Sequence, residues 1–415
     1  MGSLDDLAVL DLTRVLGGPY CTMLLADMGA NVLKVEPPGG DWVRRTPPFH
    51  HDDESEAYGG YFQSVNRGKL SLELDLTDED DREDFLSLVD RADVLVENYR
   101  AGTMERFDLS YETLHERNPG LVYAAIRGFG DPRTGATSQQ QRPAYDLIVQ
   151  AMAGVMQING QPDDPPTKFG IGIGDLFTGA LSAVGILSAL HHRERTGEGQ
   201  FVDTSMYDAM VSMCERTVYQ YSMTGEVPGR NGNSHPILFP YDAFPASDGQ
   251  VVIAAIGPSQ WDNLVEAIGR PELTAFREQS VRLENREWLR ETISDWTSER
   301  TVEEVLDVLE TVVPTAPVRT VADVFADGIA DSREMLVELG IPGTDNQVTV
   351  AGSPIKMTAT PTGPTGPAPL LDQHRGDLLD GDDDSWPETT ELLDEAANGR
   401  VPTRTDGSGD GDPEE

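Results

Sequence analysis

The sequence predicts an α/β protein with a doubly wound parallel sheet and a second, smaller domain. Short apolar runs alternate with longer helical patterns through residues 5–130. Turn signals separate them, as at Gly17-Gly18-Pro19 and at Pro37-Pro38-Gly39-Gly40. Strands that alternate with helices need crossover connections, and such connections place neighbouring strands parallel.

Five strands are predicted in order along this region, each from a mainly aliphatic run. They span residues 7–12, 31–36, 69–76, 92–97 and 121–126. A helical stretch follows the first strand and ends at Gly29. Another helix is predicted after the third strand, with Thr77 as its N-cap and Asp80 three residues further on.

Long helices are predicted after the last of these strands. They span residues 144–158, 175–195 and about 205–223. The second ends at Thr196-Gly197, and Arg193 and Arg195 lie in its last turn, where cations interact favourably with the helix dipole. These helices extend the N-terminal part of the predicted large domain over residues 1–224.

The pattern changes after residue 224. The loop at 229–236, a strand pair near 240–256 and three helical segments predict a smaller α+β domain at 225–325. The chain is then predicted to return to the large domain at 326–378. Residues 379–415 form a predicted acidic tail that is largely disordered, because it lacks the apolar content to fold.

The charge balance is extreme. The 415 residues include 72 Asp and Glu against 31 Lys and Arg, which gives a net charge of −41. A polyanion such as nucleic acid would be repelled, so it is excluded as a partner. Lysine occurs four times, at Lys34, Lys69, Lys168 and Lys356. Acidic excess with little lysine predicts a cytoplasm of molar salt, where the Debye length is only about 3 Å, and hence a halophilic archaeon.

The two cysteines, Cys21 and Cys214, exclude a disulfide framework and a cysteine-built zinc site. No metal is expected. The first residues have neither the basic nor the apolar part of a signal peptide. No apolar run approaches the roughly 20 residues that would span a bilayer, so no membrane contact is expected. Together these observations predict a cytoplasmic protein.

Alternating glycines precede a single carboxylate in the segment Phe169-Gly-Ile-Gly-Ile-Gly-Asp175. The segment fails as a dinucleotide fingerprint, but glycines at Gly170, Gly172 and Gly174 let another backbone or a ligand approach closely. A carboxylate at the head of a long helix is kept ionised by the helix dipole. The alternative interpretation is that Asp175 is an ordinary N-cap, one of 72 acidic residues.

The pattern along residues 5–378 resembles the family III CoA transferases, which include formyl-CoA and carnitine CoA transferases and a related α-methylacyl-CoA racemase. The resemblance rests on residues 10–19, 29–36, 66–69, 74–75, 93–100, 105–106, 118–123, 195–200, 313–318 and 352–356. It implies a Rossmann-like large domain, a small domain, and two ring-like subunits interlocked as a homodimer. Departures occur at Leu70, Ala101 and Ser234.

By this resemblance Asp175 is the catalytic nucleophile, and CoA or acyl-CoA binds as a substrate, with no tightly bound cofactor. The positions that would contact CoA are Leu16, Gly17, Leu74, Asn98, Tyr99, Arg100, Arg106 and Tyr145. Arg14 is a further candidate for the nucleotide phosphates, because guanidinium groups match phosphate oxygens. Gly172, Gly174, Arg230 and His235 are predicted to face the acyl substrate.

The predicted reaction moves CoA from an acyl-CoA, with succinyl-CoA as first choice, to a free C4–C5 dicarboxylic acid such as mesaconate. A carboxylate nucleophile suits it, through an aspartyl anhydride and an aspartyl-CoA thioester. One alternative is a 2-methylacyl-CoA racemase, which needs a histidine base where this chain has Tyr145. A tyrosine, with an ordinary pKa of about 10, is a poor base at neutral pH. The second alternative is an inactive CoA-binding homologue.

Overall fold

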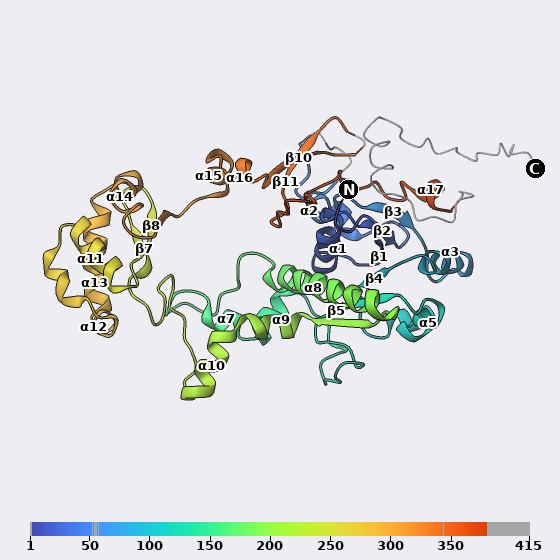
Figure 1. Cartoon of the computed structure of the whole chain (residues 1–415), viewed down its shortest axis with the longest axis horizontal. Helices are drawn as coiled ribbons and strands as arrows, with labels where there is room; N and C mark the ends of the chain where they lie inside the picture. The colour runs from blue at the N-terminus through green and yellow to red at the C-terminus, as the bar shows by residue number, and fades with distance from the viewer. Residues whose placement is uncertain (1, 52, 54–55, 57, 343, 380–415) are drawn as a thin grey trace, which may run out of the picture. The chain divides into compact units, whose positions relative to one another are not determined.

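The computed structural model describes residues 2–379 except 52, 54, 55, 57 and 343 (Figure 1). The chain forms two compact units, and each is discontinuous in sequence. The first holds Met1–Ala153, Gly170–Cys214 and the residues from Asp331 onward, and the second holds Gly154–Phe169 and Glu215–Ala330. The acidic tail predicted at 379–415 lies, beyond Leu379, outside the described residues.

A six-stranded parallel sheet forms the centre of the first unit, in the order β3-β2-β1-β4-β5-β6. Its strands are β1 Ala8–Asp11, β2 Asn31–Glu36, β3 Leu70–Glu73, β4 Val94–Glu97, β5 Val122–Arg127 and β6 Phe201–Ser205. The predicted parallel sheet and its five strands are therefore confirmed. The edge strand β6 was not predicted, because its polar Asp203, Thr204 and Ser205 hide the strand pattern.

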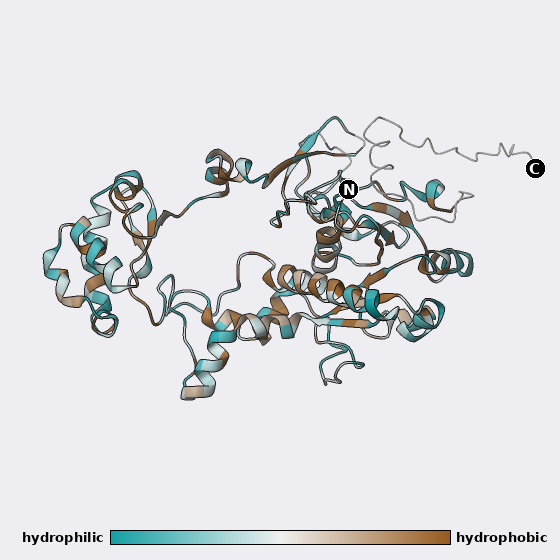
Figure 2. Cartoon of the chain, in the orientation of Figure 1, coloured by the Kyte–Doolittle hydropathy of each residue, from teal (hydrophilic) through white to brown (hydrophobic). Residues whose placement is uncertain are grey.

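The order of the strands reverses beside β1. The chain builds β2 and β3 on one side of β1, then returns to build β4 and β5 on the other, so Leu10 of β1 pairs with both Leu33 and Leu95. Where neighbouring connections leave a sheet in opposite directions, a crevice opens beyond the carboxyl ends of the strands. The strands are apolar and buried, and two clusters of buried hydrophobic residues pack against the sheet. Figure 2 colours the chain by hydropathy.

Helices on both sides of the sheet complete the first unit. They are α1 Gly17–Asp27, η1 Trp42–Arg45, α2 Gly60–Asn66, α3 Glu79–Val89, α4 Thr103–Arg106, α5 Tyr111–Arg117, α6 Asp146–Met152, α8 Ile173–Thr196, α9 Met206–Met213 and α17 Arg375–Leu379. A hairpin of β10 Leu336–Gly340 and β11 Gln347–Ala351 also belongs to it. Helices α1 and α8 touch through glycine: a Cβ on Gly179 would lie 2.4 Å from the Gly17 carbonyl oxygen.

Helix α8 corrects one expectation from the sequence. Its 24 residues are long and apolar enough to cross a membrane by length and composition, although no apolar run of that length was expected. One face of α8 packs inside the unit, with Ala183, Ile186 and Leu190 buried against the sheet. The core helix of a soluble protein passes the same test, and α8 has a buried face of the kind that such a helix has.

Helix boundaries differ from prediction where local chemistry intervenes. Asp78, not Thr77, caps α3, because its carboxylate accepts hydrogen bonds from the N–H groups of Asp80 and Asp81, while the Thr77 hydroxyl donates to Asp75. The helix predicted over 144–158 is two short helices, since Gly154 takes a left-handed φ of 87° between them. The helix predicted over 205–223 is likewise interrupted, at Cys214.

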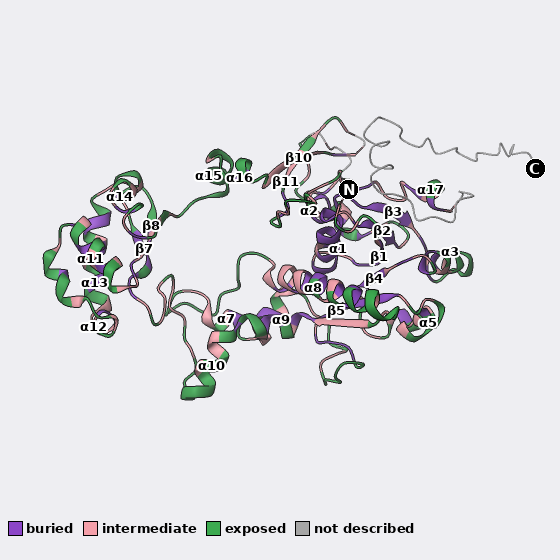
Figure 3. Ribbon diagram, viewed as in Figure 1, coloured by how far each residue is buried: buried purple, intermediate pink, exposed green. Residues whose placement is uncertain are grey.

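The second unit has its own small core. Its elements are α7 Val155–Ile158, α10 Glu215–Thr224, β7 Tyr241–Pro245, β8 Gln250–Ala254, α11 Pro258–Ala267, η2 Pro271–Phe276, α12 Gln279–Glu284, α13 Arg286–Ser298, α14 Val302–Leu309, β9 Thr315–Pro317 and α15 Val321–Ala326; α16, Ile329–Ser332, crosses its boundary with the first unit. The three strands are antiparallel. Helices α11, α13 and α14 bury Trp261, Ile293 and Leu309 in the core beside the sheet. Every residue of α10, in contrast, is at least partly exposed (Figure 3).

Candidate active site

A pocket of ≈ 320 Å³ opens at the carboxyl ends of β1, β4 and β5, where the order of the strands reverses. Residues 14–18 after β1 and 98–101 after β4 form two of its walls, and residues 126–128 at the end of β5 form a third. The loop residues 140 and 142–145 and Met206 also line it. Asp175, from the first turn of α8, reaches into the same pocket. The sheet topology therefore brings together segments that are far apart in sequence.

Asp175 is the titratable group whose pKa is most informative here. Burial and, as the smaller cause, the nearby negative charge of Asp146 together raise the pKa of its carboxyl from 3.8 to about 7. The helix terminus was expected to favour the charged form of Asp175, but burial and a like charge favour the neutral form. At neutral pH the carboxyl is poised between its charged and neutral forms.

Asp146, the first residue of α6, takes the capping role that the sequence left open for Asp175. Its Oδ1 accepts the backbone N–H of Gly174 at 2.8 Å, and its Oδ2 accepts the Gln150 side-chain amide at 2.7 Å. Within the described part of the chain, no hydrogen bond to the Asp175 side chain is found. Asp175 is thus not an N-cap, and its carboxylate is available for chemistry.

The glycines around Asp175 allow close approach. A Cβ on Gly17 would lie 3.1 Å from Asp175 Oδ1, and a Cβ on Gly172 would lie 2.9 Å from Leu16 Cδ2. A Cβ on Gly174 would lie 2.9 Å from Asp146 Oδ1. The start of α1 therefore rests directly on the start of α8, as only small residues permit. The predicted residues Leu16, Gly17, Gly172 and Gly174 are brought together with Asp175.

The Asn98 side chain holds the first wall of the pocket. Its Oδ1 accepts the Arg14 N–H at 2.8 Å, and its Nδ2 donates to the Arg14 carbonyl at 2.7 Å. The Arg14 guanidinium lies over the Tyr99 ring, 4.7 Å from its centroid. Arg100 and Tyr145, both exposed, complete the rim. Asn98 therefore acts on the protein backbone as well as lining the pocket.

Arg127, which sequence reasoning missed, lies at the base of the pocket. It is buried and pairs with Glu97 at 2.5 Å and with Asp131. Burial raises the pKa of Glu97, and the Arg127 charge opposes that rise. Glu97 and Arg127 end the adjacent strands β4 and β5. Their place at the carboxyl ends of two predicted strands is the signal that could have identified them.

Four other predicted residues lie elsewhere. Leu74 is buried in the core just after β3, and Arg106 is exposed on α4, where it donates to the Thr103 hydroxyl at 3.2 Å. Arg230 and His235 belong to the second unit. The Arg230 guanidinium donates to three backbone carbonyls there, and the His235 ring stacks on Tyr241. A role for these residues in binding substrate stays a prediction.

The chain matches the family model described as CoA-transferase family III over residues 4–375. It is 65% identical over 381 residues to a Haloarcula hispanica protein named succinyl-CoA:mesaconate CoA-transferase, covering 92% of this chain and 96% of the relative. An Acetobacter aceti acetyl-CoA:oxalate CoA-transferase is 40% identical, covering 90% and 94%. The crystal structure of a CAIB/BAIF family protein from Brucella suis superposes with a TM-score of 0.81 at 35% identity, covering 91% and 99%. The Haloarcula relative fits the halophilic source that the charge balance predicts.

Proposed function

Because the chain belongs to CoA-transferase family III, we propose that it moves CoA from succinyl-CoA to mesaconate and that Asp175 is the covalent nucleophile. The choice of substrates follows the 65% identical Haloarcula relative. The observation that carries the mechanism is the placement of Asp175, a carboxylate without a hydrogen-bond partner among the described residues, in a pocket at the carboxyl edge of a parallel sheet.

The first half of the reaction transfers CoA to the enzyme. An Asp175 carboxylate oxygen attacks the thioester carbonyl of succinyl-CoA, and the C–S bond breaks to give a succinyl-aspartyl anhydride and CoA thiolate. The thiolate then attacks the Asp175 carbonyl of the anhydride. This step forms an aspartyl-CoA thioester and releases succinate.

The second half repeats these steps with the acceptor. A mesaconate carboxylate attacks the aspartyl thioester, which forms a mesaconyl-aspartyl anhydride and CoA thiolate. The thiolate attacks the mesaconyl carbonyl, and mesaconyl-CoA leaves while the Asp175 carboxylate is regenerated. No proton is gained or lost over the cycle, so the enzyme needs an ionised Asp175 and no general acid.

Exclusion of water and a poised carboxylate both support this chemistry. An anhydride is destroyed by water, and the contact of Gly17 with Asp175 leaves little room for solvent on that side. The raised pKa keeps the nucleophile basic, since carboxylates of higher pKa attack carbonyls more readily. Arg14 and Arg100 on the rim supply positive charge for the phosphates of CoA.

We also propose that the protein is cytoplasmic and that it forms an interlocked homodimer, as the resemblance to the family implies. Exposed apolar side chains on α10 support association, with Val218 52% exposed, Tyr221 55% and Met223 82%. Light scattering of the purified protein in molar KCl is expected to give twice the chain mass of 45.2 kDa. Val218→Glu together with Tyr221→Glu is expected to lower that mass, whereas an unchanged dimer would remove α10 from the interface.

The activity is tested by incubating the enzyme with succinyl-CoA and mesaconate in molar KCl and separating the CoA thioesters. Mesaconyl-CoA and succinate are expected in equal amounts. Asp175→Ala is expected to abolish turnover without loss of folding, whereas a fully active variant would exclude the mechanism. Hydrogen exchange at Cα of a branched acyl-CoA without CoA transfer would instead indicate the racemase. The absence of both activities would indicate the inactive CoA-binding homologue.

A further inference from the structure

The backbone that precedes α1 has an unusual conformation. Val15 has a φ of 71°, which places it in the left-handed region. A β-branched side chain avoids this region because its Cβ substituents crowd the backbone, so a valine there must be held by its surroundings. Val15 lies two residues before Gly17, the residue that touches Asp175. The conformation of Val15 therefore decides where the start of α1 lies.

Side chains, rather than backbone, satisfy the polar groups of this segment. Asp11 Oδ1 accepts the Thr13 N–H at 2.9 Å, and Lys34 Nζ donates to the Thr13 carbonyl at 2.7 Å. Asn98 holds both backbone groups of Arg14. The Val15 N–H donates to Asp41 Oδ2 at 3.0 Å. The backbone of residues 13–15 therefore depends on these few side chains for its hydrogen bonds and its conformation.

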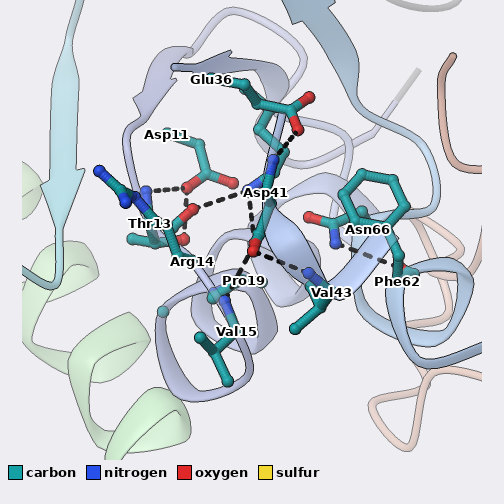
Figure 4. A network of polar contacts seen from close by, with 12 residues as sticks. Asp11, Thr13, Arg14, Val15, Pro19, Glu36, Asp41, Val43, Phe62 and Asn66 are labelled. Atoms are coloured by element: carbon teal, nitrogen blue, oxygen red, sulfur yellow. Dashed lines mark hydrogen bonds and ion pairs between the residues drawn. The ribbon is translucent and has the colours of Figure 1, made fainter. Parts of the chain in front are cut away.

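Asp41 is buried and is held in place by hydrogen bonds and by a nearby lysine. Its carboxylate is buried, and its second oxygen, Oδ1, accepts the Val43 N–H at 3.2 Å (Figure 4). Its own N–H donates to Glu36 Oε2 at 3.0 Å. Lys34 Nζ, fully buried, lies 3.8 Å from Asp41 Oδ2 and compensates its charge. Each carboxylate oxygen of Asp41 thus receives one backbone N–H, beside one of the four lysines of the chain.

We propose that Asp41, supported by Lys34, is a positioning residue for the transfer reaction: it holds Val15 left-handed and thereby seats Leu16 and Gly17 against Asp175. The inference rests on the proposed role of Asp175 as nucleophile. Asp41 does not line the pocket and acts through Val15. Displacement of Gly17 by a fraction of an ångström would shift the Asp175 carboxylate that it contacts, relative to the thioester carbonyl under attack. Such misplacement lowers turnover steeply.

Asp41→Asn tests this with minimal change in shape. An amide has one acceptor oxygen, so it can serve the N–H of Val15 or of Val43 but not both. We expect kcat to fall about 10- to 100-fold while KM for both substrates stays within about 3-fold. Asp242→Asn is the matched control. Asp242 is also buried, accepts a backbone N–H at 2.8 Å and pairs with Arg290, but it lies in the second unit. This variant is expected to keep its kcat.

A double-mutant cycle with Val15→Gly identifies the route of the effect. Glycine adopts a left-handed φ without strain, so residue 15 no longer needs the hydrogen bond to Asp41 to hold this conformation. Asp41→Asn is therefore expected to lower kcat less than about 3-fold in the Val15→Gly background. An equal loss in both backgrounds would show that Asp41 does not act through Val15 and would overturn the inference.

Two further measurements distinguish a failure of the proposed role of Asp41 from two other outcomes. These are misfolding of the Asp41→Asn variant and a failure of Asp175 as the nucleophile. If Asp41→Asn does not fold, Val15→Pro replaces it, because proline fixes φ near about −65° and removes the N–H; full activity of that variant would overturn the inference. Mass spectrometry after a single turnover with succinyl-CoA and borohydride trapping follows modification of Asp175. Absent labelling of the wild-type enzyme refutes the nucleophile, whereas equally fast labelling of wild type and Asp41→Asn refutes the role of Asp41.

Discussion

Asp146 Oδ1 accepts the backbone N–H of Gly174 at 2.8 Å, and this bond places a second carboxylate beside the residue that precedes Asp175. The arrangement has two consequences. Asp146 caps the start of α8 and so relieves Asp175 of that task. Its negative charge also adds to burial in raising the pKa of Asp175 to about 7. One side chain thereby makes the proposed nucleophile both available and more basic.

The pH dependence of turnover should reveal the effect of Asp146 on the ionisation of Asp175. Since the nucleophile must be ionised, kcat of the wild-type enzyme is expected to fall as pH drops through about 7. Asp146→Asn keeps an oxygen for the Gly174 N–H but removes the like charge, so the acidic limb should move to lower pH. A pH–rate profile measures the shift. An unmoved limb would mean that Asp146 does not control the ionisation of Asp175.

Asp175→Asn should gain stability as it loses activity. The folded-state pKa of Asp175, about 7, lies above its ordinary value of 3.8, so the folded protein loses stability as pH rises from about 4 to about 7. The uncharged amide avoids this penalty. At pH 8 the variant is expected to be more stable by at most about 4 kcal/mol, and the gain should vanish below pH ~4. Denaturation at both pH values measures it, with the exposed Asp163→Asn as an unaffected control.

The buried pair of Lys69 and Asp11 should contribute strongly to stability. Lys69 Nζ lies 2.9 Å from Asp11 Oδ2, and both side chains are fully buried. Lys69→Met removes the direct ion-pair partner of the buried Asp11 and leaves it only the more distant Lys34 charge, so it is expected to lower the free energy of unfolding by about 3–5 kcal/mol. Adding Asp11→Asn should recover part of the loss. For comparison, Arg117→Ala breaks the exposed pair with Asp90 and should cost about 1 kcal/mol or less.

The net charge of −41 predicts a strong dependence of stability on salt. The Debye length grows from about 3 Å in 1 M salt to about 10 Å in 0.1 M salt, so repulsion among surface carboxylates becomes unscreened on dilution. The melting temperature is expected to fall steeply between these concentrations. NaCl and KCl at equal ionic strength should protect alike if screening is the cause. A melting temperature independent of salt would exclude repulsion as the limiting factor.

The sequence alone predicted the family, the class of fold and the carboxylate that we propose as the nucleophile. Aliphatic strands separated by helices carry their signal locally, as in residues 7–12 and 31–36, so the parallel sheet could be predicted. The acidic composition likewise predicted a halophilic source. Local patterns also misled: Thr77 and Asp78 are both good N-caps, and the choice between them depends on the bonds each makes after folding.

Tertiary structure decided what surrounds Asp175. Gly17 on another helix and Arg127 at the end of a strand line the same pocket as Asp175, at the reversal of strand order. Asp146, 29 positions before Asp175, bonds the neighbouring Gly174 N–H. The pKa of Asp175 follows from burial and from Asp146, and neither is visible in the run Phe169–Asp175. The left-handed Val15 and its hold by Asp41 are equally hidden. Sequence patterns report local preferences, whereas ionisation and alignment depend on neighbours that only the folded chain brings within a few ångströms.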